Sequence, residues 1–240
     1  MGSMGNNAKD LYAAANGVSP LCFTDYNELT HSFIRELSFR SHGDTPPHCL
    51  FIDVEEGGDA MRMVSKTGSH SERLVRDNTT CLGKQSCAHW INRSGQKTTC
   101  GDFTAYPADQ NDSRKKINAF DQQDPFELVM SCHSISFIPN PRARCFLSNL
   151  RHVVRAGGML FISALGSYSQ LGDDYPGEEM LLEARYAPLK DNAAFHLAPD
   201  TKLCLYSERD LCNTLFDAGW SVVKSSTTTE NNVLAIAIRV

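Results

Sequence analysis

The sequence predicts one α/β domain built on a mostly parallel sheet, and three observations carry this prediction. Short apolar runs alternate with longer segments of helical periodicity along most of the chain. The runs at 49–54 and 126–131 are apolar nearly throughout, which is typical of strands covered on both faces. The final runs, 220–224 and 233–240, are separated only by a polar turn, so they predict a hairpin. Together these patterns predict a seven-stranded sheet with helices on both faces and an antiparallel C-terminal strand.

The other elements follow the same alternation of strand and helix. The helix at 140–155 opens with Asn-Pro and is followed by a Gly-Gly pair, which are typical start and stop signals. Ser207 and Asp210 form an acidic variant of the capping box at the start of another helix. Further strands are expected at 73–77, 97–100 and 159–164, and further helices at 25–39, 59–66, 80–92 and 207–218.

The chain divides into a short N-terminal segment and one domain. Residues 1–24 are expected to be flexible or partly helical, and residues 25–240 to form the domain. Residues 166–205 are a long mixed segment that follows a strand. Long ordered connections tend to be functional, so we expect this segment to be an insertion on the substrate side of the sheet.

Composition excludes several classes of protein. A net charge of −5 argues against a dedicated nucleic-acid binder. The apolar runs are too short to span a membrane, and the N-terminus does not read as a secretory signal, so we expect a cytoplasmic protein. The nine cysteines include no Cys-x-x-Cys pair, which argues against a disulfide framework and against a metal site.

Two separated stretches carry a resemblance to a known family. Phe126-Glu127-Leu128-Val129 opens a strand, and after a helix Ala156-Gly157-Gly158 opens the next one. This resembles the fourth- and fifth-strand motifs, "FDLV" and "L-K-P-G-G", of the class I S-adenosyl-L-methionine (SAM)-dependent methyltransferases, with Glu127 and Ala156 departing from the pattern. The segments 206–211 and 217–220 are similar to the family's approach to its sixth strand. The resemblance covers about two thirds of the chain and implies a Rossmann-like fold with SAM as cofactor.

The loop after the first strand departs most from the family. The family pattern is Asp-x-Gly-x-Gly-x-Gly, whereas this chain has Asp53-Val54-Glu55-Glu56-Gly57-Gly58. Glycine allows the backbone to approach a ligand closely or to adopt a positive φ. Carboxylates in this loop would repel the carboxylate of the cofactor's methionine moiety and attract its ammonium and sulfonium groups.

The cofactor-binding residues that the resemblance implies lie at or just beyond strand ends. Asp77, or Glu72 in a different register, would bind the ribose hydroxyls. Asp102 would accept a hydrogen bond from the adenine amine, and Phe103 would pack against the base. The full expected set is Asp53, Glu55, Gly57, Gly58, Asp77, Asp102, Phe103 and Ser131.

Candidate residues for chemistry and for the substrate come from two other places. His133 follows the fourth family strand, where ligands bind in open α/β sheets, and is a candidate general base. Tyr168, Asp173 and Tyr175 in the long insertion are candidate substrate contacts. If this segment covers the site, its acids favour a polar or cationic acceptor.

We therefore expect SAM-dependent methyl transfer to a small molecule. Such a direct displacement needs alignment and desolvation more than a charged catalytic apparatus. The alternative is a catalytically inactive methyltransferase-like module that binds or regulates a protein partner, which the Glu55-Glu56 loop motivates. A nicotinamide-binding protein is disfavoured because the chain has no Gly-x-Gly-x-x-Gly motif after a strand.

Overall fold

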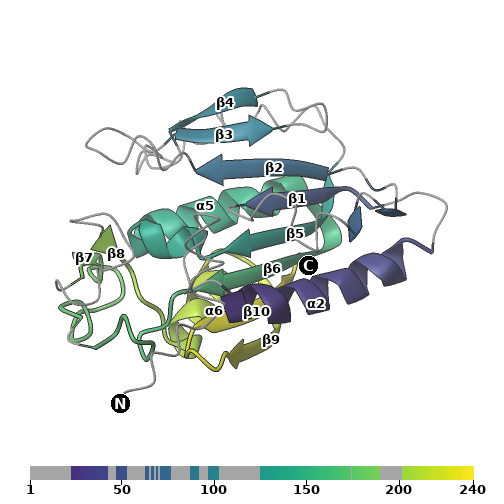
Figure 1. Cartoon of the computed structure of the whole chain (residues 1–240). Coiled ribbons are helices and arrows are strands. Elements are labelled where there is room, and N and C mark those ends of the chain that lie inside the picture. The colour runs from purple at the N-terminus through teal and green to yellow at the C-terminus, as the bar shows by residue number, and fades with distance from the viewer. Residues whose placement is uncertain are drawn as a thin grey trace, which may run out of the picture.

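A computed structural model shows the architecture of the chain (Figure 1). The structure describes residues 23–42, 47–52, 63–64, 66–67, 69, 71–76, 87–91, 97–102, 125–173, 175–189 and 202–240.

One mixed sheet organises the described residues, with the strand order β4-β3-β2-β1-β5-β6-β10-β9. Strands β2, β1, β5 and β6 are mutually parallel, whereas β3 and β10 run antiparallel to both of their neighbours. The closing hairpin of β9 and β10 confirms the predicted antiparallel C-terminal strand. The strands are β1 (Cys49–Ile52), β2 (Ser71–Arg76), β3 (Cys87–Ile91), β4 (Lys97–Asp102), β5 (Phe126–Cys132), β6 (Val154–Ala164), β9 (Ser221–Thr227) and β10 (Val233–Ile238).

The predicted helix at 80–92 is wrong over its described part, because Cys87–Ile91 forms β3. This strand pairs with β2 on one side and with β4 on the other. Trp90 and Ile91 favour a strand, and pairing with segments distant in sequence outweighs a weak local helix pattern. The sheet therefore has eight strands in the part of the chain that the structure describes, one more than predicted.

The boundary between the helix at 140–155 and the next strand also differs from the prediction. Helix α5 spans Asn140–Val153, and β6 begins at Val154 rather than at residue 159. Val154 is β-branched and pairs with Phe126 of β5, so the chain leaves the helix before the Gly-Gly pair. Gly157 adopts a left-handed conformation with φ of 75° inside the strand, and its N–H donates to the carbonyl of Arg239.

Helices pack on the two faces of the sheet (Figure 1). Helix α2 (Phe23–Arg40) contributes Phe33, whose ring lies 5.3 Å from that of Phe51 and 5.4 Å from that of Phe161. On the other face of the sheet, α5 and α6 (Glu208–Asp217) pack to form a second buried core. In this core the indole N–H of Trp220 donates to the backbone carbonyl of Leu147. No helix in the described residues is long and apolar enough to cross a membrane.

Helix α6 begins with the capping box that the sequence predicts. The Ser207 hydroxyl accepts from the backbone N–H of Asp210, and the Asp210 carboxylate accepts from that of Ser207. These two bonds satisfy backbone groups that a helix start otherwise leaves unpaired.

The described part of the 166–205 insertion has a small core of its own. Two short strands, β7 (Ala187–Pro188) and β8 (Lys202–Leu203), pair antiparallel and lie beyond the arrowheads of β5 and β6 (Figure 1). The hydroxyl of Tyr186 donates to the carbonyl of Phe137, which ties the insertion to the 3-10 helix η3 (Ser134–Phe137) at the end of β5. The insertion core comprises Leu165, Leu171, Tyr175, Ala187, Leu203 and Leu205.

Candidate functional site

The strand order of the sheet identifies the place at its carboxyl edge where this type of fold binds ligands, and we call this place the crevice. The chain runs from β1 outward to β2 on one side, whereas β5 and β6 extend on the other. Ligands of open α/β sheets bind outside the carboxyl ends of the strands at such a reversal of strand order. Ile52 at the end of β1 is paired with Ser131 of β5, so the crevice lies beyond these two residues.

Three aspartates follow strands that run in the same direction. Because β3 is antiparallel to both β2 and β4, the strands β1, β2 and β4 all end at one edge. Asp102 is the last residue of β4. Asp53 and Asp77 lie outside the described residues, but each is joined by one peptide bond to the last residue of β1 or β2. Glu72, in contrast, pairs with Leu50 near the start of both strands, so it does not lie at this edge.

Asp102 is farther from the crevice than the family resemblance implies. Strand β3 separates β4 from β2, which adds one strand spacing of about 4.8 Å. The other cofactor candidates Glu55, Gly57, Gly58 and Phe103 lie outside the described residues.

His133 occupies an unusual backbone conformation at the end of β5. Its φ of 56° and ψ of 2° are left-handed, which few residues other than glycine adopt. Its backbone N–H donates to the carbonyl of Ser163 at 3.0 Å, and its own carbonyl accepts from Ser136. The residue is 2% exposed, so its side chain is buried. A strained backbone that its surroundings hold in place is typical of functional sites.

Buried serines surround this turn. The hydroxyls of Ser131 and Ser134 are hydrogen-bonded to each other. The Ser136 hydroxyl accepts from the backbone N–H of Leu165 at 2.9 Å. The Ser163 hydroxyl accepts from the backbone N–H of His133, with 3.2 Å between the nitrogen and the oxygen. Only Ser131 was a candidate from sequence. The position of Ser134 and Ser136 just after the apolar run of β5 was the available signal for these two residues, because ligands bind beyond strand ends at this edge.

The three substrate candidates in the insertion differ in their exposure to water. Tyr168 is 72% exposed and Asp173 is exposed, whereas Tyr175 is only 4% exposed. The hydroxyl of Tyr175 lies 2.5 Å from the carbonyl oxygen of Leu203 and 3.2 Å from that of Arg185. Burial raises the pKa of Tyr175 to about 12, so the phenol remains a neutral donor inside the insertion.

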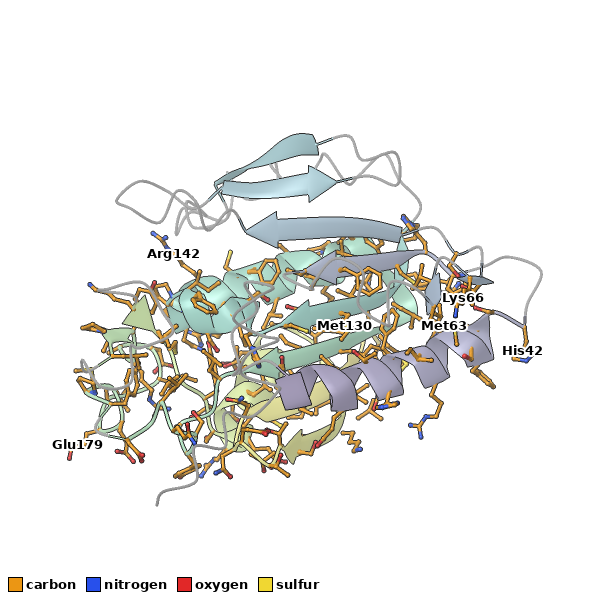
Figure 2. The ribbon with its side chains drawn as sticks, viewed as in Figure 1. His42, Met63, Lys66, Met130, Arg142 and Glu179 are labelled. Carbon is orange, nitrogen blue, oxygen red and sulfur yellow. The ribbon has the colours of Figure 1, made fainter. Side chains whose placement is uncertain are left out.

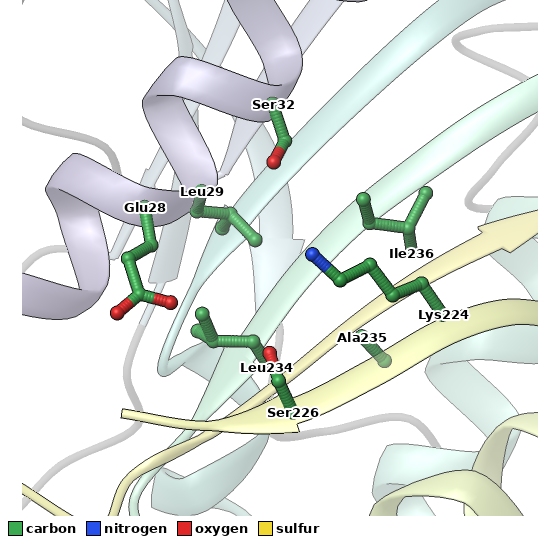
Figure 3. A pocket seen from close by; sticks show the side chains of 8 residues that line it. All are labelled: Glu28, Leu29, Ser32, Lys224, Ser226, Leu234, Ala235 and Ile236. Atoms are coloured by element: carbon green, nitrogen blue, oxygen red, sulfur yellow. The ribbon is translucent and has the colours of Figure 1, made fainter. Parts of the chain in front are cut away.

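A shallow pocket lies elsewhere, between α2 and the β9–β10 hairpin (Figure 3). The ammonium of Lys224 points into it between the side chains of Leu29 and Ile236. Strand β6 separates this hairpin from β5, and none of the sequence candidates lines the pocket. Within the described residues, no group of three or more His, Cys, Asp or Glu side chains could hold a metal ion.

The residues at the carboxyl edge fit an adenosine-containing cofactor. Carboxylates beyond parallel strand ends can accept hydrogen bonds from ribose hydroxyls and from an adenine amine. Asp53, Asp77 and Asp102 are acidic residues at or next to three such ends. On the other side of the crevice, His133 and the serines are buried polar residues at and just beyond the ends of β5 and β6.

Neither the protein-family models nor the curated proteins match this chain, but solved structures do. It is similar to a SAM-dependent methyltransferase from Mesorhizobium loti, with a TM-score of 0.56, 11% identity and coverage of 91% of this chain and 100% of that one. A second such enzyme, from Clostridium acetobutylicum, has a TM-score of 0.51, 9% identity and coverage of 97% and 99%.

A third structure is the 1,6-didemethyltoxoflavin-N1-methyltransferase of Burkholderia thailandensis, with 1,6-didemethyltoxoflavin and S-adenosylhomocysteine bound. Its TM-score is 0.53 at 10% identity, and the similarity covers 97% of this chain and 86% of that one. At such low identity the likeness concerns the fold. The chain thus has the Rossmann-like α/β fold of the class I SAM-dependent methyltransferases.

Proposed function

We propose that this protein transfers a methyl group from SAM to a small-molecule acceptor. The observation that carries the proposal is the common carboxyl edge of β1, β2 and β4, with an aspartate at or directly after each strand. Solved structures of the same fold are SAM-dependent methyltransferases, and one holds S-adenosylhomocysteine together with a small-molecule substrate.

The acidic residues of this edge are assigned to the cofactor. Asp77 would bind the ribose hydroxyls, and Asp102 would accept from the adenine amine. The loop with Glu55, Gly57 and Gly58 would meet the methionine moiety, where the carboxylate of Glu55 attracts the ammonium group. When bound, SAM supplies an electrophilic methyl group on a sulfonium.

His133 is assigned the proton transfer that the acceptor requires. Its backbone N–H donates to the carbonyl of Ser163 in β6 and its carbonyl accepts from the N–H of Ser136 in η3, so its backbone position is fixed. A positioned imidazole can remove a proton from the acceptor's nucleophilic atom as that atom attacks. Asp173 and Tyr168 are exposed on the insertion and are assigned to the acceptor, whereas Tyr175 stabilises the insertion from inside.

Calorimetric titration of the full chain with SAM and with S-adenosylhomocysteine tests the proposal. We expect dissociation constants in the micromolar range, because the carboxylates of Glu55 and Glu56 repel the methionine carboxylate of SAM but attract its ammonium group. An acceptor screen with the wild-type protein and a His133→Asn variant follows, since Asn tolerates the left-handed backbone. General-base catalysis is worth about 10²- to 10⁴-fold in rate, so the variant should bind SAM normally and lose that factor.

Two results would contradict this proposal. No heat of binding at millimolar SAM would favour the catalytically inactive module, which the two glutamates of the first loop motivate. Full activity of the His133→Asn variant would leave methyl transfer in place and contradict only the part of the proposal that assigns the proton transfer to His133.

A further inference from the structure

The loop at residues 177–184 of the insertion combines exposed apolar and acidic side chains. Leu181 is 80% exposed and Met180 is 45% exposed. Glu178, Glu179 and Glu183 of the same loop are exposed as well. The sequence from 168 to 184 contains no Lys, Arg or His, so no basic residue of this segment neutralises these acids. We call residues 177–184 the acidic loop; Figure 2 shows Glu179 pointing away from the body of the molecule.

The acidic loop is held in place by the side chain of Arg185. Its Nε and Nη2 donate to the carbonyl of Met180 at 3.3 and 3.2 Å, and its Nη1 donates to Asp210 at 2.8 Å and to Leu205 at 3.3 Å. The Arg185 side chain is only 14% exposed. A partly buried guanidinium that joins the loop to the start of α6 restricts the loop's motion.

The two ends of the loop are fixed as well. Gly177 lies against the ring of Tyr175 so closely that an added Cβ would come within 2.5 Å of the ring, and the ring is itself buried. Leu182 packs against the core formed with α5 and α6, so one leucine is anchored while its neighbour Leu181 faces water. Backbone hydrogen bonds from Met180 to Gly177 and from Ala184 to Leu181 close the two turns.

A fixed loop that presents adjacent apolar side chains to water is suited to binding. Contiguous exposed apolar surface on a folded protein marks sites of interaction, and a loop fixed in advance loses less entropy when it binds. Acidic side chains around an apolar centre select a partner of opposite charge and increase its association rate. This arrangement does not depend on the proposed methyl transfer, because none of the loop's residues is assigned to cofactor or acceptor.

We propose that the acidic loop is a docking surface for a basic segment of another protein that carries an apolar side chain. Leu181 and Met180 form the apolar contact, and Glu178, Glu179 and Glu183 pair with Lys or Arg of the partner. Truncating a central apolar anchor costs more than removing a rim charge, whereas the rim charges carry the dependence on salt.

The test measures binding of a fluorescein-labelled 14-residue amphipathic peptide of Lys and Leu by fluorescence anisotropy. A peptide with Glu in place of Lys is the charge control. The variants are Leu181→Ser and the triple change Glu178→Gln, Glu179→Gln and Glu183→Gln. Matched controls are Phe39→Ser, which removes an apolar side chain of similar exposure on α2, and Glu28→Gln, which removes an exposed acid on the same helix.

We expect the Lys–Leu peptide to bind, the Glu–Leu peptide not to bind, and Leu181→Ser to weaken binding about tenfold. The triple variant should also bind more weakly and show a smaller dependence on salt. SAM affinity should be the same in all variants, so failure of docking and failure of the proposed function are distinguishable. Equal binding by wild type and Leu181→Ser, or an equal loss in Phe39→Ser, would overturn the proposal.

Discussion

The two sides of the crevice are built differently. Strands β5 and β10, with sequences FELVMSC and VLAIAI, are largely buried, and both lie on the β5–β6 side. Strands β2 and β4, SERLVR and KTTCGD, carry charged and hydroxyl side chains and lie on the other side, next to β1. The apolar side holds the buried His133 turn, whereas the polar side carries the aspartates assigned to the cofactor. The described buried strands and the aspartates that we assign to the cofactor thus lie on different sides of β1.

The largest expected effect is loss of the apolar side's packing. Phe161→Ala on β6 removes a 1% exposed ring that contacts Phe33, and should lower the free energy of unfolding by about 3–5 kcal/mol. Urea denaturation of wild type and variant measures this change in the free energy of unfolding. The matched control Val223→Ala, at a side chain that is 63% exposed on β9, should change the free energy by less than about 0.5 kcal/mol. Equal losses at both positions would mean that β6 does not form the centre of the core.

The Asp210 carboxylate should contribute the next largest effect. Burial acts to raise the pKa of Asp210, but hydrogen bonds from Ser207 and the ion pair with Arg185 outweigh it and hold the pKa below its ordinary value. Asp210→Asn should therefore cost about 1–3 kcal/mol of unfolding free energy at pH 7.

The same variant has a predicted dependence on pH. A lowered pKa in the folded state gives stability that is present above the unfolded value near 3.8 and is lost as pH falls through the folded value. The difference between wild type and Asp210→Asn should shrink below about pH 4, as measured by urea denaturation across pH. Asp217→Asn is the control, because that carboxylate is 56% exposed and its pair with Arg144 should contribute under about 1 kcal/mol. A constant difference down to pH 2 would contradict the role of the carboxylate.

Asp102→Asn tests the polar side of the crevice. The change keeps the size of the side chain and removes its charge, so SAM binding should weaken about tenfold, or about 1.4 kcal/mol, in calorimetric titration. The free energy of unfolding should stay within about 0.5 kcal/mol of wild type, since Asp102 ends an edge strand. Unchanged affinity would show that β3 places Asp102 too far from the cofactor, and Asp77→Asn would then be the informative variant.

The smallest expected effect distinguishes the contribution of the left-handed backbone of His133 from the contribution of its imidazole. His133→Gly and His133→Ala both remove the imidazole, but only glycine adopts a φ of 56° without strain. His133→Gly should therefore be more stable than His133→Ala by about 1 kcal/mol in urea denaturation. Glycine is ordinarily the less stable of the two, so the reverse order would mean that the turn relaxes when the imidazole is removed.

Elements with strong local patterns could be predicted from the sequence. The apolar runs of β1 and β5, the capping box of Ser207 and Asp210 and the closing hairpin appear in the structure as predicted. Strand β3 could not be predicted in this way, because its pairing partners are distant in the sequence and its own five residues carry little periodicity.

The candidate site divides in the same way. The sequence singled out Ser131 and His133 because they end an apolar strand, and that position follows from local order. It did not indicate the left-handed conformation of His133 or its contact with Ser163, thirty residues farther along the chain. Tyr175 was a candidate substrate contact, yet its hydroxyl hydrogen-bonds inside the insertion, because its ring is buried among residues from β7 and β8.

The sequence by itself determined that this chain forms an α/β sheet with a closing hairpin and acidic residues after its strands, since burial patterns and helix caps act over a few residues. Only the tertiary structure decided the strand order, the eighth strand and the neighbours of His133. These features depend on hydrogen bonds and packing between segments that are far apart in the chain. The free energy of such long-range contacts cannot be estimated from the sequence of one segment alone.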